Sequence, residues 1–88
     1  MFVIVVYDVN ERRVAKYLKT LRRYLTWVQR SVFEGEIEEA GLRKMKSEIG
    51  RFMVRDEDSV VIYKFRTKQY YEREEMGVPR QSSENQIL

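Results

Sequence analysis

Apolar and polar positions fall into distinct blocks along this 88-residue chain, and the first block is an unbroken apolar run. Phe2-Val3-Ile4-Val5-Val6-Tyr7 contains four β-branched residues, and Asp8 follows at once. β-Branched and aromatic side chains suit a strand, and the run is too short for an ordinary core helix. A half-buried strand would alternate apolar with polar residues, so both faces of this one should be covered. The run predicts a central strand with a carboxylate at its C-terminal end.

The second block repeats at helical spacing. Asn10 is a good N-cap for a helix that begins near Glu11. Five apolar residues then recur every three or four positions, as on a helix that lies on a core: Val14, Tyr17, Leu18, Leu21 and Leu25. The opposite side of the helix carries four cations: Arg12, Lys16, Lys19 and Arg23. The pattern therefore predicts an amphipathic helix with a basic stripe.

Two shorter β-like stretches follow, at residues 26–29 and 32–37. Arg30-Ser31 between them either forms a tight turn that joins two strands or marks a bulge in a single strand. Gly35 indicates another bulge or a close approach of backbone. This region therefore predicts two antiparallel strands or one irregular strand.

The pattern becomes helical again over residues 38 to about 53, with Gly50 as an alternative end of the helix. Asp56-Glu57-Asp58 is a polar turn, and residues 59–65 form the last clear strand. The order of elements is β-α-β-β-α-β, the split βαβ arrangement of ferredoxin-like α+β folds. Right-handed crossovers place both helices on one face of a four-stranded antiparallel sheet.

This fold leaves the other face of the sheet without a cover, although the first strand is apolar on both sides. A second copy packed against that face, as a two-fold dimer, would bury it. We assign residues 1–66 to the ferredoxin-like domain and residues 67–88 to a polar C-terminal tail. By composition the tail is frayed; the alternative is that residues 85–88 add a short strand to the edge of the partner's sheet.

Composition narrows the chemistry. Because the chain has no Cys and no His, it can form no disulfide, thiolate nucleophile, Cys/His zinc site or histidine general base. Nothing resembles a signal peptide or an apolar run of spanning length, so we expect a cytoplasmic protein with no membrane partner. The net charge is only +3, but residues 1–30 hold seven basic and two acidic residues. Such a local field favours a polyanion, and a solvated helix face is the alternative.

Asp8 is the first candidate for a functional site. Ligands of open sheets with crossover helices tend to bind outside the C-terminal ends of strands. If the dimer axis passes near Asp8, two carboxylates face each other and resist joint ionisation unless a cation lies between them. Mg²⁺ suits such a place because it keeps several waters and often takes one or two carboxylates, and it could activate a water against a phosphodiester. Alternatively, Asp8 only caps the turn into the helix.

Four further residues are candidates for a functional site. Arg30 and Ser31 could bind phosphate through a guanidinium and a hydroxyl, although a plain hairpin turn explains them equally well. Tyr7 and Phe33 lie at that end of the sheet or along it, and core packing is the alternative for both rings.

Three segments together resemble a known family. They are Val5-Val6-Tyr7-Asp8-Val9 with the basic helix after it, Trp27-Val28-Gln29-Arg30-Ser31-Val32-Phe33-Glu34-Gly35, and the strand at residues 58–63. In these segments the chain is similar to the CRISPR-associated Cas-two family, the small dimeric subunit of the CRISPR adaptation machinery.

The resemblance implies a ferredoxin-like homodimer in which Asp8 of both subunits lies at the interface and can hold Mg²⁺. It also implies a catalytic site made of the residues that match the family's motifs: Asp8, Tyr7, Arg13, Arg30, Ser31 and Phe33. Family members are described as metal-dependent endonucleases on RNA or duplex DNA, and also as scaffolds that hold duplex DNA for the Cas-one integrase.

We therefore predict a dimeric, nucleic-acid-binding subunit of CRISPR spacer acquisition with Mg²⁺-dependent endonuclease activity. The stripe formed by Arg12, Lys16, Lys19 and Arg23 is its predicted nucleic-acid-binding surface. Two alternatives stay open. One is a non-catalytic DNA-binding scaffold that bridges integrase subunits, and the other is a toxin-like ribonuclease of the same fold.

Overall fold

The first apolar run forms a central strand of a four-stranded antiparallel sheet. A computed structural model of the chain describes residues 1–67, 69 and 72–78. The strand order is β2-β3-β1-β4, and the strands are β1 (Phe2–Asp8), β2 (Thr26–Gln29), β3 (Val32–Glu36) and β4 (Ser59–Phe65). Strand β1 pairs with β3 on one side and with β4 on the other, which confirms its predicted central place.

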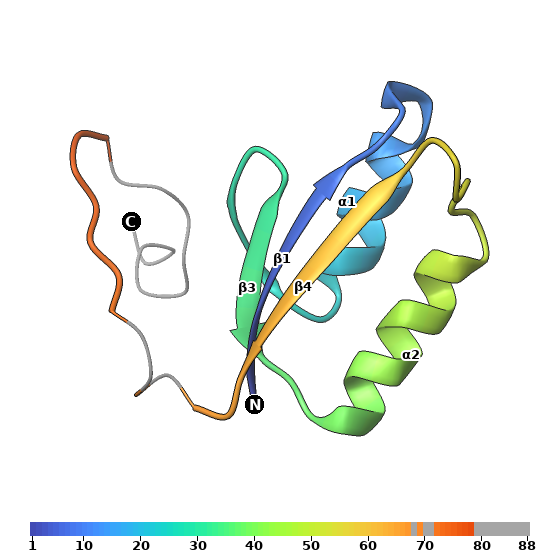
Figure 1. The fold of residues 1–88 in the computed structure, drawn as a ribbon. Coiled ribbons are helices and arrows are strands. Elements are labelled where there is room, and N and C mark those ends of the chain that lie inside the picture. The colour runs from blue at the N-terminus through green and yellow to red at the C-terminus, as the bar shows by residue number, and fades with distance from the viewer. Residues whose placement is uncertain (68, 70–71, 79–88) are drawn as a thin grey trace.

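Two helices pack on the same face of this sheet, α1 (Val14–Arg22) and α2 (Glu39–Gly50) (Figure 1). The predicted β-α-β-β-α-β order and ferredoxin-like α+β fold are thereby confirmed. The helix bounds differ from the predicted pattern by more than one residue at three ends. A single 3₁₀ turn, η1 (Glu11–Arg13), precedes α1, and Asn10 caps it by accepting a hydrogen bond from the Arg12 N–H at 2.9 Å.

The other two differences lie at the C-terminal ends of the helices. Helix α1 stops at Arg22, three residues before Leu25, the last residue of the predicted apolar pattern. It stops there because the N–H groups of Arg23 and Tyr24 turn to carbonyls three residues back. Helix α2 stops at Gly50, the alternative end, where glycine weakens helical propensity. Both shortened helices keep their apolar faces on the sheet.

From Val3 onward, burial alternates between the two faces of β1. Val3, Val5 and Tyr7 point to the helices and are buried, while Ile4 and Val6 lie on the opposite face. The core between sheet and helices gathers residues from both layers: Val3, Val5, Tyr7, Tyr17, Leu21, Leu25, Phe33, Ile37, Leu42, Met45 and Ile49.

The face of the sheet opposite the helices, the open face, is apolar along β1 and β4. Register pairs Ile4 with Tyr63 and Val6 with Val61, so these four side chains share that face. Tyr63 is 53% and Val61 43% exposed, which is unusual for neighbouring large apolar side chains. Within the described residues, the helices leave this part of the sheet uncovered.

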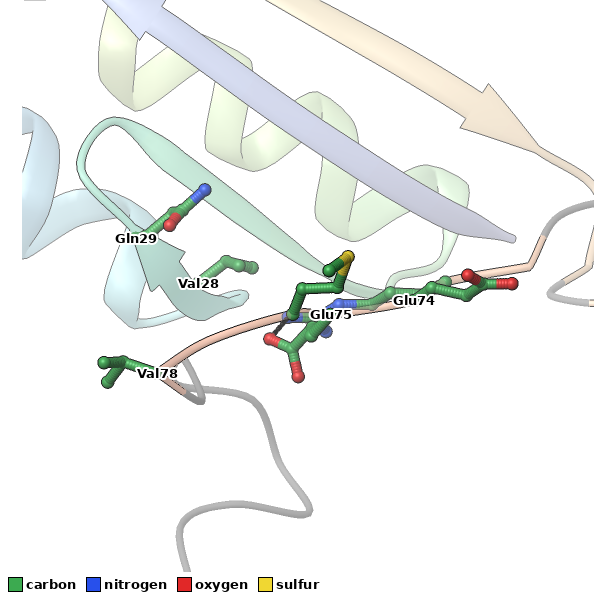
Figure 2. Close-up of a pocket in the computed structure, with 7 residues that line it drawn as sticks. Val28, Gln29, Glu74, Glu75 and Val78 are labelled. Atoms are coloured by element: carbon green, nitrogen blue, oxygen red, sulfur yellow. Dashed lines mark hydrogen bonds and ion pairs between the residues drawn. The ribbon is translucent and has the colours of Figure 1, made fainter.

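Residues 72–78 lie beside the other half of the sheet, where Arg73 forms an ion pair with Glu34 of β3. Figure 2 shows this segment passing β2, with Val28 and Gln29 on the strand side of a pocket of about 410 Å³. Residues 85–88, predicted as a frayed end or as a strand for a partner's sheet, lie outside the described residues. The domain boundary after residue 66 stays a prediction.

The segment between β2 and β3 confirms the prediction of two strands joined by a tight turn, and not that of a single strand with a bulge at Arg30-Ser31. Arg30-Ser31 is a hairpin turn, with Arg30 at a φ of 43°, and β2 also carries a register shift between Trp27 and Gln29. The Trp27 indole N–H donates to the Arg30 carbonyl at 2.9 Å and closes the turn. Gly35 marks a close approach, since a Cβ there would lie 3.3 Å from Leu25 Cδ2.

In the part of the chain that the structure describes, neither helix is long and apolar enough to cross a membrane.

Candidate functional site

The C-terminal end of β1 places Asp8 between two other segments. On one side Asp8 pairs with Ser59, the first residue of β4. On the other side the Tyr7 N–H donates to the Ser31 carbonyl at 3.1 Å, which holds the β2–β3 turn beside the strand end. Asp8 and Arg30 are exposed and Ser31 is half-buried. The structure therefore brings these three predicted site residues to one end of the sheet.

The capping alternative for Asp8 is not what the structure has, because Asn10 is the residue that caps η1. Strand alternation puts Asp8 on the open face, with Ile4 and Val6. Its carboxylate thus stands at the edge of the apolar surface of β1 and β4.

Tyr7 and Phe33, the two predicted aromatic site residues, lie inside the core. They are 3% and 0% exposed, and the Tyr7 ring stacks on the Tyr17 ring with centroids 5.5 Å apart. Burial raises the pKa of the Tyr7 hydroxyl, while the Ser31 side chain and the charge of Arg22 oppose that rise. Tyr7 is therefore protonated at neutral pH, and the packing of both rings agrees with the core alternative.

Arg13 belongs to a group of residues that the sequence did not reveal. Its guanidinium donates to the Asp58 carboxylate through Nε and Nη2, both at 2.8 Å, and Nη2 also donates to Glu57 at 2.8 Å. The Tyr17 hydroxyl donates to Asp58 Oδ2 at 2.9 Å. Two backbone N–H groups, those of Asn10 and Val54, complete the shell of donors at 3.2 Å each.

We call Asp58, Arg13, Tyr17 and the N–H groups of Asn10 and Val54 the Asp58 cluster. The Asp58 side chain is fully buried, and a buried carboxylate is tolerated only when charge and hydrogen bonds compensate its lost hydration. The Arg13 guanidinium holds the pKa of Asp58 far below its usual range, against the effect of burial. Burial and the neighbouring carboxylate raise the pKa of Tyr17 to about 12.

Asp58 was predicted as part of a polar turn and as the first residue of a strand segment, and the structure places it in the turn just before β4. No local pattern could have separated it from Asp56, because its partners Arg13 and Tyr17 lie 45 and 41 residues away in the sequence. Arg13 was predicted as a site residue near Asp8, and the structure commits its guanidinium to Asp58 and Glu57.

The predicted basic stripe divides into two parts. Arg12, Lys16 and Lys19 are exposed along η1 and α1. Arg23 instead forms an ion pair with Glu48 of α2, and the same carboxylate accepts a hydrogen bond from the Tyr24 hydroxyl. Arg23 therefore joins the two helices, and the uncommitted part of the stripe is shorter than predicted.

Magnesium needs oxygen ligands, and the described residues supply few of them in one chain. No group of three or more His, Cys, Asp or Glu side chains lies together among these residues. Asp58 cannot serve, because its oxygens already accept five hydrogen bonds. Asp8 fits, since Mg²⁺ often takes only one or two carboxylates and completes its shell with water.

The fold and this strand-end carboxylate define a small ferredoxin-like protein, and the comparisons identify its family. The family model for CRISPR associated protein Cas2 matches residues 1–73, so the chain belongs to the Cas2 family.

Three similar proteins illustrate the relationship. A protein of Dictyoglomus turgidum, named CRISPR-associated endoribonuclease Cas2, is 50% identical over 88 residues, all of both chains. A solved structure described as a crystal structure of Cas2 is 44% identical and superposes with a TM-score of 0.81 over 90% of this chain and 88% of the other. Cas2 of Streptococcus pyogenes, at 28% identity, gives a TM-score of 0.77 over 88% and 100%.

The Asp58 cluster makes a prediction for stability. Asp58→Asn removes the anion that Arg13 needs, so we expect the melting temperature at pH 7 to fall by about 5 °C or more. The wild type has the full contribution of Asp58 above about pH 4 and loses it as pH falls toward the depressed native pKa. Urea unfolding between pH 7 and 2.5 should therefore show a weaker acid dependence for the variant.

Asp56→Asn is the matched control, because Asp56 is exposed and lies in the same turn. An equal loss of stability in both variants would contradict the role assigned to Asp58.

Proposed function

We propose that this chain is a dimeric nucleic-acid-binding subunit of CRISPR spacer acquisition, and that it is an endoribonuclease-type, Mg²⁺-dependent nuclease. The observation that carries the proposal is the exposed Asp8 carboxylate at the end of β1, on the rim of an apolar sheet face. The names of its relatives as CRISPR-associated endoribonucleases support the class of activity. RNA and duplex DNA are both candidate substrates.

The exposed apolar surface of β1 and β4 supports a homodimer through the open face. Packing two such sheets together would bury Val61 and Tyr63. A small chain with one modest core would gain stability from this additional buried apolar area. Since Asp8 shares this face with Ile4 and Val6, a two-fold axis near the end of β1 brings two Asp8 carboxylates together.

Two facing carboxylates explain why the site would take a cation. Their mutual repulsion disfavours ionisation of both, and a divalent cation between them removes that cost. Bound Mg²⁺ supplies activation of a water and stabilisation of the leaving oxygen. The chain's own groups do the rest. The two Asp8 carboxylates would hold the ion, and Arg30 and Ser31 on the adjacent turn would hold a phosphate of the substrate.

The exposed cations of α1 supply binding to the rest of the nucleic acid. Arg12, Lys16 and Lys19 follow one side of η1 and α1 and can contact successive phosphates without reading bases. This surface also supports the second candidate, a non-catalytic scaffold that holds duplex DNA for the Cas-one integrase. The two candidates differ only in what Asp8 does.

Replacing Asp8 separates them. We expect Asp8→Asn to lower metal-dependent cleavage of RNA or duplex DNA by on the order of 100-fold or more, because the amide cannot replace a charged ligand. The fold should persist, since the side chain is exposed. Single-turnover cleavage with Mg²⁺ and with EDTA measures this, with Asp56→Asn as the matched control. Full activity in Asp8→Asn would exclude the proposed site, and no cleavage by any of the proteins would favour the scaffold.

The basic stripe is tested through salt dependence. Replacing Arg12, Lys16 and Lys19 by Gln should weaken duplex binding and reduce the slope of log K against log salt by about 0.9 for each phosphate that the variant no longer neutralises. The control replaces Arg43, Lys44 and Lys46 on α2, which changes the net charge equally. Titrations at several salt concentrations should distinguish the two triple variants. Identical slopes would mean that only net charge matters.

The dimer is tested by placing a charge on the open face. Val61→Lys should give the mass of one chain in sedimentation equilibrium at micromolar concentration, whereas the wild type should give twice that mass. Ala40→Lys adds the same charge at an exposed position of α2, and this variant should stay dimeric. A wild-type protein that is monomeric at these concentrations would overturn the proposed interface.

A further inference from the structure

The backbone on both sides of Asp8 is tied to one buried carboxylate. After Asp8, the chain turns into η1, and this turn is fastened where the Asn10 N–H donates to Asp58 Oδ1 at 3.2 Å. Three residues further on, the Arg13 guanidinium donates hydrogen bonds to both oxygens of the same carboxylate, each at 2.8 Å. A planar guanidinium that binds both oxygens fixes direction as well as distance.

Before Asp8, the connection runs through an aromatic stack. The ring of Tyr7 lies on the ring of Tyr17 with an interplanar angle of 12°, and the Tyr17 hydroxyl donates to Asp58 Oδ2 at 2.9 Å. Asp58 also immediately precedes Ser59, which pairs with Asp8 across the ladder. Asp58 is therefore connected to three residues around Asp8: Tyr7 before it, Asn10 two positions after it, and Ser59, the cross-strand partner of Asp8.

We infer that Asp58 is a positioning residue for Asp8: through Asn10, Arg13 and Tyr17 it fixes the backbone from which the Asp8 carboxylate projects. The inference rests on the proposed function of Asp8 and extends it to a residue that touches neither ion nor substrate. It also assigns Arg13 to this framework.

Stability alone gives a weak reason for such an arrangement. A largely buried ion pair such as Arg13–Asp58 is frequently no more stabilising than well-packed apolar residues of the same volume. What a fully satisfied buried network does supply is one defined geometry, because each broken hydrogen bond leaves a buried polar group unpaired. That property matters most where a carboxylate must meet a second copy of itself at a fixed distance.

The chain offers a matched pair of substitutions to test the inference. Tyr17→Phe removes one hydroxyl-to-carboxylate bond from the Asp58 cluster and keeps the ring that stacks on Tyr7. Tyr24→Phe removes a bond of the same kind, to Glu48, between the end of α1 and α2. The two variants lose the same atom and the same type of interaction, but only Tyr17 is connected to Asp8.

Two readouts are needed, one of them independent of cleavage. The first is the split of kcat and KM for metal-dependent cleavage by the dimer. The second is NMR of the metal-free protein, following hydrogen exchange of the Asn10 amide and the carboxyl resonance of Asp8. We expect Tyr17→Phe to lower kcat on the order of fivefold with KM unchanged, to speed Asn10 exchange and to shift the Asp8 resonance. Tyr24→Phe should leave kcat, Asn10 exchange and the Asp8 resonance unchanged, even if its melting temperature falls as far as that of Tyr17→Phe.

Asp58→Asn should give a larger loss of kcat, roughly 10- to 100-fold, as removal of groups that orient metal ligands does elsewhere. If that variant fails to fold, Tyr17→Phe decides. Equal effects of Tyr17→Phe and Tyr24→Phe would overturn the inference, and so would faster Asn10 exchange with an unchanged kcat. If the wild type cleaves nothing, the proposed activity fails, and the Asn10 and Asp8 signals alone decide whether Asp58 positions Asp8.

Discussion

The two faces of β1 set the main constraint on this structure. A seven-residue strand paired on both edges satisfies its backbone hydrogen bonds, but its side chains are apolar on both sides, and two helices can cover only one. The helix side becomes the core around Val3, Val5 and Tyr7. The other face of the sheet is apolar and exposed at Val61 and Tyr63 of the neighbouring strand β4. The same alternation that buries Tyr7 places Asp8 on the open face, so the candidate site lies at the edge of the apolar surface of β1 and β4 that we propose as the dimer interface.

The second organising feature is a charge inside the fold. Asp58 is buried beside Arg13 and Tyr17, and its position before β4 lets it reach the turn that follows β1. It thereby links the start of the last strand to the end of the first. Arg23 and Glu48 make a comparable connection between the helices, but at an exposed site where screening by water reduces what an ion pair contributes.

These interactions change how the cations of the first helix are understood. A stripe read from helical spacing treats Arg12, Lys16, Lys19 and Arg23 as equivalent. In the folded chain Arg23 is paired with α2, while the other three remain exposed. In a chain without His or Cys, carboxylates are the charged side chains that can hold a metal ion, so the placement of each aspartate matters. The three aspartates differ in their placement: Asp8 is exposed at a strand end, Asp56 is exposed in a turn, and Asp58 is buried and hydrogen-bonded.

The sequence by itself determined the element order, the central strand, the apolar helix faces and the carboxylate at the end of the first strand. These features depend on the spacing of apolar residues, with periods of two and 3.6 residues, and on local turn chemistry. Both can be read from residues that lie close together in the sequence. Only the tertiary structure decided that Phe33 is fully buried, that Arg13 is held by Asp58, and that Asp58 differs from Asp56. Those outcomes join residues that are far apart in the sequence, 45 positions for Arg13 and Asp58, and no local period records which distant partner a side chain will meet. Helix ends fell between the two cases, since Leu25 keeps the apolar spacing of α1 although the chain has already turned toward β2.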